Sequence, residues 1–182
     1  MTRWLIFTIC TLFFLRFSWR SLGNPASHGF YRFFVLEGLL GLILRNHPHW
    51  FKNPFAPQQL FSWLLLLASI FFVLHSLQLL KEHGGQSERT TMPENHAFEN
   101  TVELVEKGLY RHVRHPMYAS LLFLGWGLFL KTSPCLTWPL WGGVSFALLI
   151  TARIEEHENL RFFGSAYHHY MQRTRRFIPW VL

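Results

Sequence analysis

A dense run of cationic and aromatic residues lies at Gly108–Tyr118 and is interrupted by a proline. Pro116 has no N–H group and a fixed φ, so it predicts the first turn of a helix, with His115 or Arg114 at the cap. The unpaired N–H groups of that helix start would face Arg111, Arg114 and the histidines, which suits an anionic ligand. The alternative is that the two arginines only anchor a membrane helix to lipid headgroups.

Residues that extend this candidate site follow on the same predicted helix. His115 and Tyr118 are three positions apart, so their side chains lie on one helix face. Gly125 and Gly127 flank Trp126 and leave a surface without side chains, which another backbone or a flat ligand can approach. Close helix packing is the alternative for the glycines, because small residues are common where membrane helices meet.

A pair of acidic residues, Glu155 and Glu156, follows an apolar run that carries no charge until Arg153. Adjacent carboxylates at the end of such a run repel each other and stay ionised only with partners. We interpret them as ligand-binding groups, because a carboxylate accepts hydrogen bonds from ribose hydroxyls or from a ligand ammonium. The alternative is a solvated helix end in which Glu158 pairs with Arg161.

The C-terminal segment is aromatic and strongly basic. Tyr167 and Tyr170 lie three apart on a predicted helix, and Arg173 and Arg176 follow them. The pattern is typical of an amphipathic helix at a membrane surface, a role that is compatible with a lid over a ligand. The histidines of the chain have no HExxH spacing and no cysteine joins them, so no metal site is predicted.

The composition indicates a membrane protein. The chain has 182 residues, of which 50% are hydrophobic and only 15% are charged, whereas soluble domains are about a quarter charged. Its formal charge is +7, but the basic residues lie between apolar runs. That distribution favours anionic lipid headgroups or a charged small ligand over nucleic acid. Cys10 and Cys135 both lie in apolar stretches, so no disulfide framework is implied.

Five apolar runs predict an all-α, polytopic membrane helix bundle with a helical C-terminal segment on the cytoplasmic side. The run Gln58–Leu80 has no Asp, Glu, Lys or Arg and matches the roughly 20 residues that span a bilayer. For the first run, a signal peptide is the alternative. The second run is short, so a count of four spans is the alternative to five. The predicted spans are Trp4–Leu15, Phe30–Leu44, Gln58–Leu80, Pro116–Leu130 and Leu136–Ala152.

The loops between these runs predict an orientation and two further local features. With five spans, the basic segments around Arg20, Arg114 and Arg176 all fall on one face, which we expect to be cytoplasmic, with the N-terminus outside. The last two apolar runs are separated by only five residues, which predicts a tight antiparallel hairpin. We also expect a short amphipathic helix over 98–105.

These motifs together resemble the integral-membrane methyltransferases related to isoprenylcysteine carboxyl methyltransferase and the phospholipid N-methyltransferases. The resemblance implies S-adenosylmethionine as methyl donor, bound at the cytoplasmic end of the last two helices and covered by the C-terminal segment. It makes 101–182 the methyltransferase core, with a cofactor-binding hairpin and a lid, and leaves 1–100 as helices and a polar loop on the substrate side. The motifs that carry it are Gly108–Arg111, Arg114–Tyr118, Glu155-Glu156, Phe163-Gly164, Tyr167, Tyr170 and Ile178-Pro179.

The resemblance also implies roles for individual residues. It matches Gly125 and Gly127 to a G-x-G cofactor motif and Glu155-Glu156 to a paired-glutamate motif. One position departs from the family pattern, since Ser120 stands where glycine is common. The predicted cofactor-binding residues are Arg114 and His115 for the carboxylate, Glu155 and Glu156 for the ribose or amino group, and Tyr118, Gly125 and Gly127 for the pocket wall. Arg153 and Arg173 are the predicted catalytic residues, which would orient an acidic acceptor.

Three questions stay open at the level of sequence. Membrane sterol reductases that use NADPH share a similar arginine-histidine-proline segment, although they tend to have Asn where this chain has Met117. A non-catalytic membrane protein of the same fold is the second alternative. The acceptor is a hydrophobic or lipid-like small molecule, and a prenylcysteine carboxylate, a phospholipid amine, a thiol and an isoprenoid all remain candidates. Membrane lipids are the other expected partners, and the sequence identifies no protein partner.

Overall fold

The computed structural model describes residues 1–85, 101–132 and 134–179, and in these residues the chain is all-helical and forms no strand. An all-α fold was predicted, and it is confirmed. The α-helices are α1 (Thr2–Leu22), α2 (His28–Asn46), α3 (Pro57–His83), α4 (Pro116–Phe129), α5 (Pro134–Phe163) and α6 (Ser165–Arg173). Two short 3-10 helices, η1 (His47–His49) and η2 (Gly108–Arg111), lie between them.

Each of the five apolar runs lies in one long helix. The prediction that a helix begins at Pro116 is confirmed, and of the two expected caps, His115 and Arg114, the structure has His115. The largest difference is in α5, which continues 11 residues beyond the expected end at Ala152. The polarity changes there, but no Gly or Pro interrupts 144–163, and the helix ends only before Gly164, whose φ is 59°.

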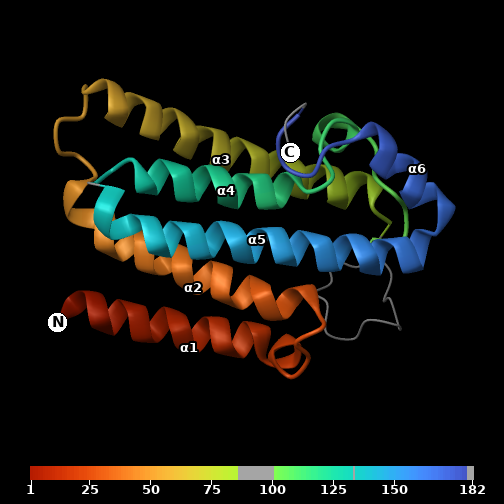
Figure 1. The fold of residues 1–182 in the computed structure, drawn as a ribbon, viewed down its shortest axis with the longest axis horizontal. Coiled ribbons are helices and arrows are strands. Elements are labelled where there is room, and N and C mark those ends of the chain that lie inside the picture. The colour runs from red at the N-terminus through yellow and green to blue at the C-terminus, as the bar shows by residue number, and fades with distance from the viewer. Residues whose placement is uncertain (86–100, 133, 180–182) are drawn as a thin grey trace.

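The long helices run antiparallel, in the order α3, α4, α5, α2 and α1 across the bundle (Figure 1). The main apolar core joins α2, α3, α4 and α5, with its largest buried side chain, Trp141, on α5. The outer helices α1 and α3 expose large apolar side chains, for example Trp4 at 76% and Leu64 at 60%. Apolar surface of that extent is costly in water and favourable in lipid.

Two helices, α1 and α3, are long and apolar enough to cross a membrane, and α4 is a shorter apolar helix of 14 residues. The antiparallel arrangement brings the end of α1, the start of α2, the end of α3, the start of α4 and the C-terminal segment to one end of the bundle (Figure 1). The basic segments that were used to predict orientation therefore lie together.

The short helix expected over 98–105 is not present in its described part. Residues 101–105 form a bridge, bends and irregular backbone, and 98–100 lie outside the described residues. Thr101–Val105 carries few strong helix formers, and the segment instead packs the side chain of Val105 against Leu79 and Tyr110.

Candidate functional site

A cavity of about 100 Å³ lies at the end of the bundle where α3 ends and α4 begins. Its walls come from the end of α3, the segment 101–118, α5 and α6. Aromatic rings of Tyr110, Phe163, Tyr167 and Tyr170 form much of the lining, and Glu155 supplies a carboxylate. The cavity therefore combines apolar ring faces with one acidic group.

The carboxylate of Glu155 is held by two residues of the predicted site. The hydroxyl of Tyr118 donates a hydrogen bond to Glu155 Oε2, and His115 Nδ1 lies 3.8 Å from Oε1. The His115 ring stacks on Tyr118, with centroids 5.3 Å apart and an angle of 16°. Burial opposes ionisation of Glu155, but nearby His115 and His28 and the Tyr118 hydroxyl lower its pKa overall, so the group stays ionised.

The neighbouring carboxylate of Glu156 faces a different side of α5 and binds two arginines. Arg114 Nε donates to Oε1 at 2.8 Å, and Arg176 donates through Nε at 3.1 Å and Nη2 at 2.6 Å. Glu156 is only 4% exposed. Burial alone would raise its pKa, but His115 and the two arginines hold the pKa well below the ordinary range. In this arrangement Glu156 is bound by protein groups, whereas Glu155 faces the cavity.

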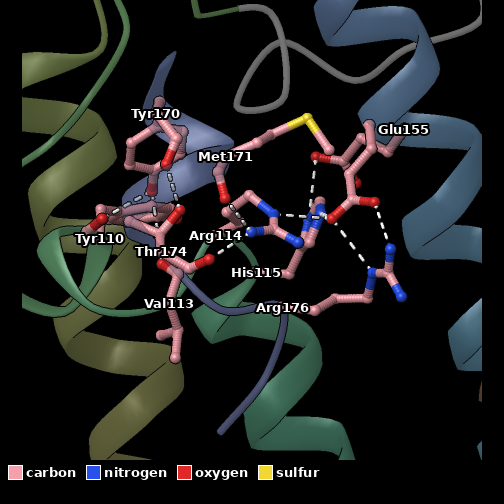
Figure 2. A network of polar contacts seen from close by, with 10 residues as sticks. Tyr110, Val113, Arg114, His115, Glu155, Tyr170, Met171, Thr174 and Arg176 are labelled. Atoms are coloured by element: carbon pink, nitrogen blue, oxygen red, sulfur yellow. Dashed lines mark hydrogen bonds and ion pairs between the residues drawn. The ribbon is translucent and has the colours of Figure 1, made fainter. Parts of the chain in front are cut away.

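Arg114 joins α5 to the C-terminal segment, as Figure 2 shows. Besides its bond to Glu156, its Nη1 donates to the carbonyl of Met171 at 3.1 Å and to that of Thr174 at 2.5 Å. Bonds from a guanidinium to carboxylate and carbonyl oxygens are among the strong ones in proteins. Arg114 lines the cavity, but its main partners are protein groups.

The C-terminal segment also pairs with the backbone of the opening motif. The N–H groups of Arg114 and His115 donate to the carbonyls of Arg175 and Arg176 at 2.7 and 3.0 Å, and Val113 forms a parallel bridge with Arg175. Phe177 is 1% exposed, in the main core. The sequence did not predict this pairing, because an isolated bridge has no periodic pattern.

The two glycines of the expected G-x-G motif lie away from the cavity and pack against other helices. A Cβ atom on Gly125 would collide with the ring of Trp141 on α5, and one on Gly127 would meet Leu66 on α3. Ser62 Oγ donates to the Gly127 carbonyl at 2.7 Å. The geometry therefore agrees with the packing alternative at both positions.

The two predicted catalytic arginines lie outside the cavity lining. Arg153 is exposed on α5. Arg173 is 60% exposed in its side chain, lies 2.5 Å from Glu106 Oε2, and lines a second groove next to the cavity. The structure thus brings Arg114, His115, Tyr118, Glu155 and Glu156 together, and it leaves both arginines at the periphery.

Two residues of α2 that the sequence did not predict belong to this cluster. His28 Nδ1 lies 2.6 Å from Glu158 Oε2, and its backbone N–H donates to Oε1 at 3.3 Å. Glu158 therefore pairs with His28, one turn beyond Glu155 on α5. Arg32, 7% exposed, interacts electrostatically with Glu155 and Glu158. The sequence did carry one indication of this role, because Arg32 is a basic residue within the apolar run Phe30–Leu44.

Comparison with known families gives a match over helices that line the cavity. Residues 57–166, more than half of the chain, match the family described as Phospholipid methyltransferase. The match runs from the start of α3 to the first residues of α6 and includes both Glu155 and Glu156. Comparison with curated proteins and with solved structures gave no match. The chain belongs to the phospholipid methyltransferase family.

Proposed function

We propose that this protein is an integral-membrane methyltransferase that takes its methyl group from S-adenosylmethionine and transfers it to a hydrophobic or lipid-like acceptor. The observation that carries the proposal is the ionised carboxylate of Glu155, held by Tyr118 and His115 and facing a cavity walled by aromatic rings. Family membership supports methyl transfer in general.

The residues around the cavity fit the chemical groups of that cofactor. Glu155 can accept hydrogen bonds from ribose hydroxyls or an ammonium, and the rings of Phe163 and Tyr167 suit an adenine face or a sulfonium cation. His115 lines the cavity with its ring stacked on Tyr118, while its Nε2 lies 3.5 Å from Glu156 Oε1. Ligand pockets usually measure about 300 Å³ or more, so a nucleoside requires the segments around this cavity to move apart.

When bound, S-adenosylmethionine supplies an electrophilic methyl group for an in-line displacement. The contribution of the protein is then mainly to position the reactants and to exclude water. Glu155, with Tyr118 and His115, orients the polar part of the cofactor. The bonds of Arg114 and Arg176 to Glu156 hold the C-terminal segment against the cavity, so this segment acts as the lid.

The proposal includes a membrane placement and a division of the chain. All five long helices span the membrane, the cavity faces the cytoplasm, and the N-terminus lies outside. Residues 1–100 then select the acceptor, which enters sideways between helices, and 101–182 carry the transfer. Arg153 and Arg173 stay candidates for orienting an acidic acceptor from the cytoplasmic surface.

Binding of S-adenosylhomocysteine to the full chain in detergent, measured by calorimetry, tests the cofactor assignment. Glu155→Gln should weaken binding by at least about tenfold, because it removes a charged hydrogen-bond acceptor from the cavity. Glu156→Gln should lower thermal stability instead, with a smaller change in affinity of the folded protein. Equal binding by wild type and Glu155→Gln would refute the role of Glu155.

Two further ligands separate the alternatives in the same assay. Preferential binding of NADPH would favour a reductase, and the absence of a thermal shift with either nucleotide would favour a non-catalytic protein. Mass spectrometry of lipid extracts incubated with labelled S-adenosylmethionine and the full chain would then identify the acceptor.

A further inference from the structure

An open groove of about 660 Å³ lies beside the cavity, on the other side of Tyr170. Its walls are 106–112 on one side and the end of α6 on the other. Tyr170 lines both spaces and donates a hydrogen bond to the Tyr110 carbonyl at 2.6 Å, so it forms the partition between them. Half of the residues that line the groove are basic, namely Lys107, Arg111, His112 and Arg173, and Glu106 is acidic.

The charges in the groove are only partly compensated. Arg173 forms an ion pair with Glu106 at 2.5 Å, which fixes one cation against the acid that the described residues contribute to the lining. Lys107 and Arg111 are exposed and form no ion pair with the described residues. Two cationic side chains that line one groove without a partner attract an anion.

The position of the groove along α3 indicates which anion is abundant next to it. Gly108, with φ of 55°, packs so closely against Leu79 and His75 of α3 that a Cβ atom would not fit. The 27 residues of α3 measure about 40 Å, longer than the roughly 30 Å hydrocarbon core. The last turns of α3, and the groove with them, therefore lie near the headgroup level of the bilayer, where phosphate is the abundant anion.

We propose that this groove binds the phosphate group of a membrane lipid headgroup, with Lys107 and Arg111 as the contacting cations. The inference rests on the proposed function only through the placement of α3 across the membrane. It assigns a lipid site separate from the cofactor cavity and does not require that this lipid be the methyl acceptor.

The test measures binding to the full chain in an uncharged detergent by thermal shift and calorimetry. The probes are a short-chain phosphatidylglycerol, the diacylglycerol with the same chains, and glycerol 1-phosphate. The test variant is Lys107→Gln/Arg111→Gln. The matched control is Arg20→Gln/Arg161→Gln, which removes two exposed cations at the same end of the bundle but outside the groove.

We expect wild type and control to bind the phospholipid, and the groove variant to bind it about tenfold more weakly. Equal affinity of the groove variant and the control, or equal binding of the diacylglycerol, would overturn the phosphate site. Equal affinity for glycerol 1-phosphate would overturn the lipid as the source of the phosphate. S-adenosylhomocysteine binding is measured in parallel, so a protein that binds the phospholipid but no nucleotide would refute the proposed function alone.

Discussion

Glu155 and Glu156 are neighbours in the chain, yet their carboxylates have different partners. Successive helical residues point about 100° apart, so one faces the cavity while the other meets Arg114 and Arg176. The sequence predicted the importance of the pair and of the Arg114–Tyr118 motif. It could not predict which glutamate faces the cavity, because Arg176 comes from a segment that shows no periodic pattern.

The buried ion pairs of Glu156 predict a specific loss of stability in acid. Since its pKa is lowered on folding, its contribution is complete above the unfolded value of about 4.3 and is lost as the pH falls below it. At pH 7, Glu156→Gln should cost of order 3 kcal/mol. In thermal unfolding, the difference in stability between Glu156→Gln and wild type should become smaller below about pH 4. The variant Glu103→Gln, at an exposed position, should have the stability of wild type at every pH.

Arg32 is expected to keep Glu155 ionised. The groups that lower the pKa of Glu155 are His115 at the start of α4, His28 on α2, the bonded Tyr118 hydroxyl and Arg32 on α2. Removing the positive charge should raise the pKa of Glu155. In Arg32→Gln, affinity for S-adenosylhomocysteine should therefore be lost at a higher pH than in wild type as the pH is lowered.

The conservative variant Arg32→Lys keeps the charge and should restore the wild-type profile. If affinity for S-adenosylhomocysteine depended on pH in the same way in wild type and Arg32→Gln, the role of Arg32 would be limited to packing α2 against α5.

At the scale of the elements, the glycines of α4 determine how closely α5 and α3 approach it. Gly125 accommodates the ring of Trp141, and Gly127 accommodates Leu66 of α3. Sequence spacing alone fits both a ligand surface and a helix contact, because it does not show which partner approaches. The start of α4 was predictable because Pro116 marks it, whereas the true end of α5 depends on Gly164 rather than on polarity.

Gly125→Ala should therefore destabilise the bundle by about 1–3 kcal/mol, since the added methyl group collides with Trp141. Gly142→Ala is a matched control on α5, where nothing lies within 4 Å of an added Cβ atom, and it should raise stability by up to about 1 kcal/mol. Thermal unfolding in detergent measures both. A stable Gly125→Ala variant that fails to bind S-adenosylhomocysteine would instead support the cofactor motif.

At the scale of the whole molecule, the antiparallel order places the residues that follow α1 and α5 at one end of the bundle and those that follow α2 at the opposite end. We expect cysteines introduced at Ala26 and Gln172 to react with an impermeant maleimide from the cytoplasmic side. One at Phe55, which is 85% exposed between α2 and α3, should react only from the outside. The background carries Cys10→Ser and Cys135→Ser. Labelling of Phe55→Cys and Gln172→Cys from the same side would contradict three spans between them.

The pairing of the C-terminal segment with Val113–His115 has a consequence for biosynthesis. Chains are made and fold from the N-terminus, so the five long helices are synthesised before 174–179. Until these residues are made, the guanidinium of Arg114 lacks the carbonyl of Thr174 and Glu156 lacks Arg176. The contacts that complete the surroundings of Glu156 and Arg114 are therefore among the last of the described fold to form.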